Sequence, residues 1–96
     1  MPLFGKKKSP EEQIAATRAK LRDLVQQCLA GKIQRTELPE RFYTLMKNEF
    51  PLQYLAEPTV NHYMSDTSDL PREARMIYGA TMLPTLQRIL AEAQGR

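Results

Sequence analysis

Cys28 and His62 are the two residues of this chain that most resemble catalytic machinery, because a thiolate nucleophile needs a nearby base, normally a histidine. The chain holds one cysteine and one histidine. Cys28 falls on the apolar stripe of an expected helix, where cysteine usually acts as a small hydrophobic side chain. The pattern therefore indicates packing for Cys28 rather than nucleophilic chemistry.

Carboxylates are the other groups that could carry out acid–base chemistry, and they would need a defined separation within a cleft. Most acidic residues instead fall at expected helix starts or in loops, where capping and the helix dipole account for them. Examples are Glu37, Glu40, Glu57, Asp66 and Asp69. We therefore predict no catalytic residue, and we predict that the protein is not an enzyme.

Metal and cofactor sites also lack their ligands. A structural zinc site needs four ligands, which one cysteine and one histidine cannot supply. An EF-hand alignment that places Gly31 at its central glycine puts Cys28 and Ala30 at two calcium-ligand positions, and neither side chain offers an oxygen. The glycines stand alone, so no phosphate-binding loop is present. We predict no metal and no cofactor.

The N-terminal segment joins an apolar pair, Leu3 and Phe4, to a lysine run, Lys6, Lys7 and Lys8. This combination could dip into an anionic membrane surface or dock on an acidic partner, although the attachment would be weak and sensitive to salt. Proline rather than glycine follows Met1, so N-myristoylation could not strengthen it. The alternative interpretation is a solvated tail.

Arg18 and Arg22 stand four residues apart on the first expected helix and could contact phosphates, or could simply belong to a solvated helix face. Asp23 shares that helix, and no aromatic residue is interleaved for base stacking. The net charge of +3 equals the contribution of the lysine run alone. A nucleic-acid partner is therefore disfavoured, and membrane contact would be peripheral at most.

The 96 residues predict one domain, since apolar residues at 42% and charged residues at 26% are ordinary globular values. We expect a flexible basic tail over residues 1–8 and a single helical domain over residues 9–96. The lone cysteine, the lack of an apolar signal segment and the lack of a stretch of roughly 18 apolar residues predict a cytoplasmic protein.

The first helix is predicted over residues 10 to about 30. Ser9, Pro10 and Glu12 form a capping-box pattern at its start. Apolar side chains then recur at helical spacing as far as Leu29. Gly31 suits the position after the helix, where a positive φ is needed.

A four-residue phrase, hydroxyl–any–Leu–Pro, occurs three times and begins at Thr36, Ser68 and Thr81. It is typical of a helix start, because a Ser or Thr oxygen can accept a first-turn N–H and proline is tolerated there. The first copy predicts a second helix that begins at Thr36 or at Pro39 and ends near Phe50. Residues 51–67 predict one or two short helical turns and a polar loop.

The second copy predicts a last helix from residue 70 to about residue 93. Pro84 falls inside it, where its missing N–H costs roughly 3 kcal/mol in a regular helix. The helix is either kinked near residues 79–81 or broken, with Thr81 capping a second helix, and the third copy of the phrase favours the break. No alternating strand pattern is present. We predict an all-α fold, a small bundle of four or five helices with the last helix kinked or broken near Pro84.

Residues 24–33, followed by Glu37, Leu38 and residues 42–45, resemble the first helical hairpin of small bacterial immunity proteins that neutralise nuclease toxins. The resemblance implies an inhibitor role. Residues 36–96 depart from it, because they are nearly neutral whereas a nuclease inhibitor usually presents an acidic face.

The sequence thus predicts a small, non-catalytic protein–protein interaction or regulatory module whose partner is another protein. The broad apolar last helix, with five Met and four Tyr in the chain, suggests that burial could be completed by self-association into a homo-oligomer. The alternatives are an immunity-like toxin inhibitor and a weak anionic-membrane or nucleic-acid adaptor acting through the tail. The candidate binding residues are Leu3, Phe4, Lys6, Lys7, Lys8, Arg18 and Arg22.

Overall fold

The computed structural model describes residues 9–95, so the predictions for Leu3, Phe4 and the lysine run lie outside the described residues. These residues form four α-helices and no strand, which confirms the all-α prediction. The α-helices are α1 (Pro10–Leu29), α2 (Leu38–Glu49), α3 (Pro58–Ser65) and α4 (Arg72–Ala93). Two 3₁₀ turns, η1 (Arg35–Glu37) and η2 (Leu52–Tyr54), precede α2 and α3.

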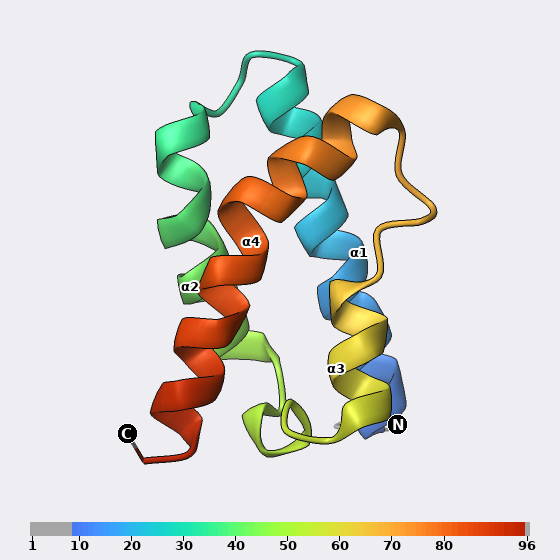
Figure 1. Ribbon diagram of the computed structural model, residues 1–96, viewed down its shortest axis with the longest axis vertical. Helices are drawn as coiled ribbons and strands as arrows, with labels where there is room; N and C mark the ends of the chain where they lie inside the picture. The colour runs from blue at the N-terminus through green and yellow to red at the C-terminus, as the bar shows by residue number, and fades with distance from the viewer. Residues whose placement is uncertain (1–8, 96) are drawn as a thin grey trace, which may run out of the picture.

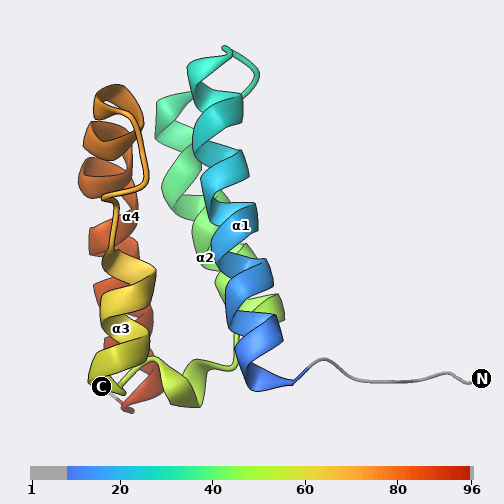
Figure 2. The same ribbon diagram turned by 90° about the vertical axis from the view of Figure 1, so that its right-hand side faces the viewer.

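The helices form two layers (Figures 1 and 2). α1 and α2 make an antiparallel hairpin, and α3 and α4 cover one side of it. α4 packs on both α1 and α2, and its buried side chains join theirs in one core. Within residues 9–95, no helix has the length and apolar composition needed to cross a bilayer.

α1 has the predicted start and end. The Ser9 hydroxyl accepts the Glu12 N–H at 3.2 Å, and the Glu12 carboxylate accepts the Ser9 N–H at 3.0 Å, so the capping box is present. Gly31 follows the helix with φ +81°, a left-handed conformation that glycine adopts without strain. The chain then turns back towards α2.

None of the three hydroxyl side chains in the repeated phrase caps a helix, so the capping alternatives at Thr36 and Thr81 are wrong. Thr36 lies inside η1, and α2 begins at Leu38 without a side-chain cap. Ser68 lies in a turn where its N–H donates to Asp66, and α4 begins four residues later. Thr81 donates its hydroxyl to the Ile77 carbonyl within α4. Serine and threonine can form such local bonds in place of caps.

Of the two alternatives predicted for the last helix near Pro84, the kink fits whereas the break is wrong, because α4 runs unbroken to Ala93 and changes direction near its middle (Figure 1). Pro84 lies on the exposed side of α4, where a bend can open towards solvent. Thr85 donates its hydroxyl to the Thr81 carbonyl at 2.9 Å, a contact that often bends helices. The bend keeps Met82 and Leu86 in the core on either side of the proline.

Residues 51–67 are more helical than predicted, because α3 extends over eight residues.

The last helix does not need a second molecule to bury its apolar face. Most of its apolar side chains are buried against the other elements, and among the described residues of α4 the large apolar side chain left exposed is Met76.

Candidate functional site

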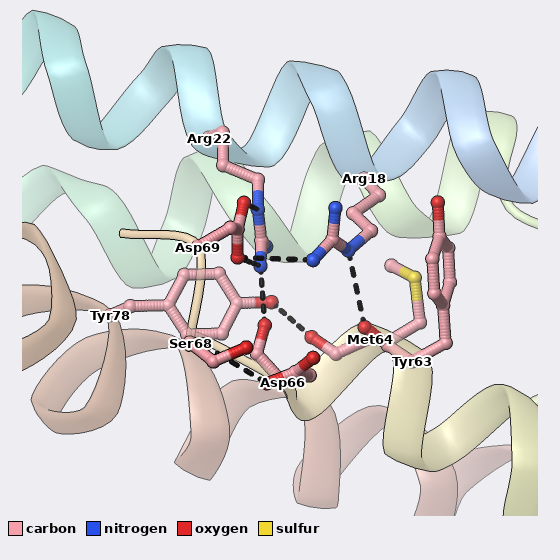
Figure 3. A network of polar contacts seen from close by, with 8 residues as sticks. All are labelled: Arg18, Arg22, Tyr63, Met64, Asp66, Ser68, Asp69 and Tyr78. Atoms are coloured by element: carbon pink, nitrogen blue, oxygen red, sulfur yellow. Dashed lines mark hydrogen bonds and ion pairs between the residues drawn. The ribbon is translucent and has the colours of Figure 1, made fainter. Parts of the chain in front are cut away.

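Two of the predicted binding residues, Arg18 and Arg22, join a polar network between α1 and the segment that connects α3 to α4 (Figure 3). Arg22 donates to the two Asp69 carboxylate oxygens at 2.9 and 3.2 Å, and it also donates to the Asp66 carbonyl. Arg18 donates to Asp69 at 3.1 Å and to the Tyr63 carbonyl at 3.2 Å. We call Arg18, Arg22 and Asp69 the arginine clamp.

The aromatic residues around the clamp fix its position. The Arg18 guanidinium lies 4.6 Å from the centre of the Tyr63 ring, and that of Arg22 lies 5.2 Å from the Tyr78 ring. Tyr78 is fully buried, and its hydroxyl donates to the Met64 carbonyl at 2.6 Å. α3 and the loop after it are thereby held onto α1.

Two pKa values are shifted at the clamp, for different reasons. Hydrogen bonding from the Arg22 guanidinium lowers the pKa of Asp69 to about 2, because the bonds stabilise the charged carboxylate. Burial raises the pKa of Tyr78, because removal from water disfavours a phenolate. Both groups keep one protonation state at neutral pH, as expected of a structural network.

The solvated-face interpretation is wrong for Arg18 and Arg22, whose side chains are only 19% and 11% exposed. Both guanidiniums already hold partners within the chain. Phosphate binding by these arginines stays a prediction, and it would require the clamp to open. The sequence could not show the clamp, since Asp69 lies 47 residues beyond Arg22.

The suspected thiol–imidazole pair is not assembled. His62 adjoins Tyr63, whose carbonyl contacts Arg18, whereas Cys28 lies ten positions further along α1. Ten helical residues span about 15 Å. Cys28 instead lies half-buried beside Leu29 and Met76.

The largest hollow described, about 600 Å³, lies between α1 and α2. Its lining mixes both charge signs, and its cations are already paired: Lys20 contacts Glu49, and Arg41 contacts Glu37 at 3.2 Å. Its apolar lining, Leu24 and Leu45, is half-buried. The lining of this groove therefore leaves neither of its cations without an acidic partner.

A second surface lies where α1 ends and α4 begins, at the top of Figure 1. Three adjoining hollows of about 420, 430 and 350 Å³ share lining residues there. Leu29 and Met76 line them and are 37% and 59% exposed, and Ile33 and Ile77 are buried beneath. We call this region, with its surrounding charges, the end surface.

Unpaired cations gather at the end surface. Elsewhere in residues 9–95 every Lys and Arg has an acidic partner within 4.0 Å. The exceptions are Arg35, Arg72 and Arg75, which line the hollows, and Lys32, in the turn beside Ile33. One carboxylate, Glu73, is placed among them. The described part of the chain thus leaves its free positive charge beside two of its exposed large apolar side chains, Leu29 and Met76.

Two of these cations lie where the dipole of α4 disfavours positive charge. Arg72 and Arg75 occupy the first turn of α4, where the helix dipole favours negative charge. Neither arginine has a carboxylate partner to offset this cost. Residues that break a local rule without compensation within the fold are expected at functional sites.

We expect Arg72→Glu and Arg75→Glu each to raise the free energy of unfolding by roughly 0.3–1 kcal/mol, because glutamate complements the dipole at these positions. Urea denaturation followed by circular dichroism measures the change. Arg88→Glu is the control, and it should destabilise because Arg88 pairs with Glu92 and lies 4.2 Å from the Tyr43 ring centre. A loss of stability in either test variant would mean that the arginine makes a structural contact.

Sequence reasoning missed the end surface, although one signal was visible. Arg72 follows Pro71 directly and Arg75 comes three residues later, so a helix starting there places cations in its first turn. Their lack of partners and their closeness to Leu29 depend on tertiary structure and could not be seen.

Comparisons with models of known protein families, with curated proteins and with solved structures find no match to this chain.

Proposed function

We propose that this protein is a small, non-catalytic interaction module that binds another protein through its end surface. One observation carries the proposal: Leu29 and Met76 border the same hollows as the unpaired arginines. Interface centres combine apolar anchors with arginine, and methionine adapts to partners of varied shape.

Tyr63 is the other large apolar side chain exposed among the described residues, and the Arg18 guanidinium covers one face of its ring. It therefore offers a partner less than Leu29 and Met76 do. The immunity-like alternative has less support, because an inhibitor of basic nucleases should present acidic groups, whereas the free charge at the end surface is positive.

Site-specific crosslinking tests the proposal. A photoreactive amino acid at position 76, in the full chain expressed in its source cells, should crosslink a distinct protein, and Leu29→Glu should abolish the product. The same probe at the exposed Asn48 is the matched control, because that position reports on the α1–α2 groove. Equal products at both positions, or none at position 76, would refute the proposed function.

A further inference from the structure

We propose that the end surface recognises an acidic segment of its partner that places a bulky apolar side chain among its carboxylates. This inference rests on the proposed function and specifies the chemistry of the partner.

Charge complementarity carries the first step. The end surface includes four cations, Lys32, Arg35, Arg72 and Arg75, and one carboxylate, Glu73, which leaves a net charge of +3. Guanidinium groups bind carboxylates through two parallel hydrogen bonds, and these arginines are exposed and without acidic partners. An acidic segment would supply the missing partners.

The hollow between α1 and α4 indicates that the segment also contains an apolar side chain. Cys28, Leu29 and Met76 border it, and the buried Ile33 and Ile77 underlie it. Its volume of about 420 Å³ is within the range of sites that hold organic groups. A carboxylate alone would leave this apolar lining in water, so an apolar side chain in the segment is needed to cover it.

Self-association through the same surface is disfavoured. A two-fold symmetric dimer places one patch against its own copy, so the cations would face cations. The single carboxylate, Glu73, cannot neutralise them.

Nucleic acid and anionic lipid fit the surface less well. Among residues 9–95, no aromatic side chain on which a base could stack lines these hollows. A lipid surface would contact the protruding cations but would not require an apolar pocket. Both remain outcomes of the test below.

The experiment selects short random peptides displayed on phage against the full chain. We expect enrichment of sequences with several Asp or Glu around a large apolar residue. Arg75→Glu should weaken binding of a selected peptide about tenfold, as removal of one interfacial charge pair does. Arg41→Glu is the matched control, because it makes the same change of charge on the exposed side of α2 and should leave binding unchanged.

Cys28 gives a second measurement that does not depend on substitution. It borders the hollow and is the only cysteine in the chain, so its alkylation by iodoacetamide reports on occupancy. A bound acidic peptide should slow alkylation, and a peptide with its acids changed to lysines should not.

Selection of no peptide, or of peptides without an acidic excess, would overturn the inference. So would equal weakening by Arg41→Glu and Arg75→Glu. Binding of duplex DNA or phosphatidylserine vesicles that depends on Arg75 and exceeds peptide binding would replace the acidic segment with that ligand. In each case a crosslink from position 76 to a protein would leave the proposed function standing. If that crosslink is also absent, both the proposed function and the acidic-segment inference are refuted.

Discussion

Replacing Phe42 by alanine is expected to lower the free energy of unfolding by about 3–5 kcal/mol, the usual cost of removing a buried phenylalanine. Phe42 on α2 is fully buried, and its ring meets that of Tyr78 on α4 edge to face, with the centroids 6.0 Å apart. The pair joins the two layers of helices, so the cavity would open where the layers meet. Small domains are stable by only about 5–15 kcal/mol, so the loss is large.

Urea denaturation of the full chain at neutral pH tests this expectation. Thr44→Ala is the matched control, since Thr44 is exposed on the same helix and its removal should change stability by less than about 0.5 kcal/mol. A Phe42→Ala variant that lost under about 1 kcal/mol would show that α2 and α4 do not pack as described.

Asp69→Asn is expected to cost about 1–2 kcal/mol at neutral pH, because Arg18 and Arg22 lose the charged acceptor that they share. The effect should fall below that of breaking a fully buried pair, since the Asp69 side chain is 46% exposed and solvent screens its charge. The control is Asp23→Asn, because Asp23 lies exposed on α1 and accepts one hydrogen bond from Gln27.

The pH dependence of folding stability provides a second test of the contacts between Asp69 and the two arginines. Asp69 has a pKa of about 2 in the folded protein, below its ordinary value of 3.8. Its ionised form therefore stabilises the fold above about pH 4, and this contribution is lost as the pH falls towards 2. Hydrogen bonds from Ser68 also lower the pKa of Asp66. The difference between the wild type and Asp69→Asn isolates the contribution of Asp69, and a difference that did not shrink below pH 4 would contradict the clamp.

Local signals were sufficient for much of the fold. The capping box at Ser9 and the positive φ of Gly31 depend on residues adjacent in the chain, and both appear as predicted. Phe42 and Met46 recur at helical spacing and are buried as expected. The bundle class follows from such patterns, because each helix buries one apolar stripe.

The errors arose where two local rules competed. Thr81 could cap a new helix or bond back to Ile77, and Pro84 could end a helix or bend it. Tertiary packing decided, because continuing α4 keeps Met82, Leu86 and Ile89 in the core. The free energy gained by burying these side chains cannot be judged from the sequence pattern alone.

The candidate site was the least accessible part of the molecule. Arg18 and Arg22 were identified as notable, but their partner Asp69 comes from a distant loop. The end surface joins the end of α1 to the start of α4, and what distinguishes its cations is the lack of a partner. A cation can be recognised as unpaired only when the tertiary structure shows which acidic residues lie near each Lys and Arg.

The most direct test of the end surface as a docking site is an amide NMR titration of the full chain with a peptide from the acidic selection. We predict chemical-shift changes at the amides of Leu29, Ile33, Arg35 and Met76, with the amides of Asn48 and Thr44 in the α1–α2 groove unchanged. Shift changes confined to the α1–α2 groove, or no change at the end surface at a saturating concentration of peptide, would contradict it.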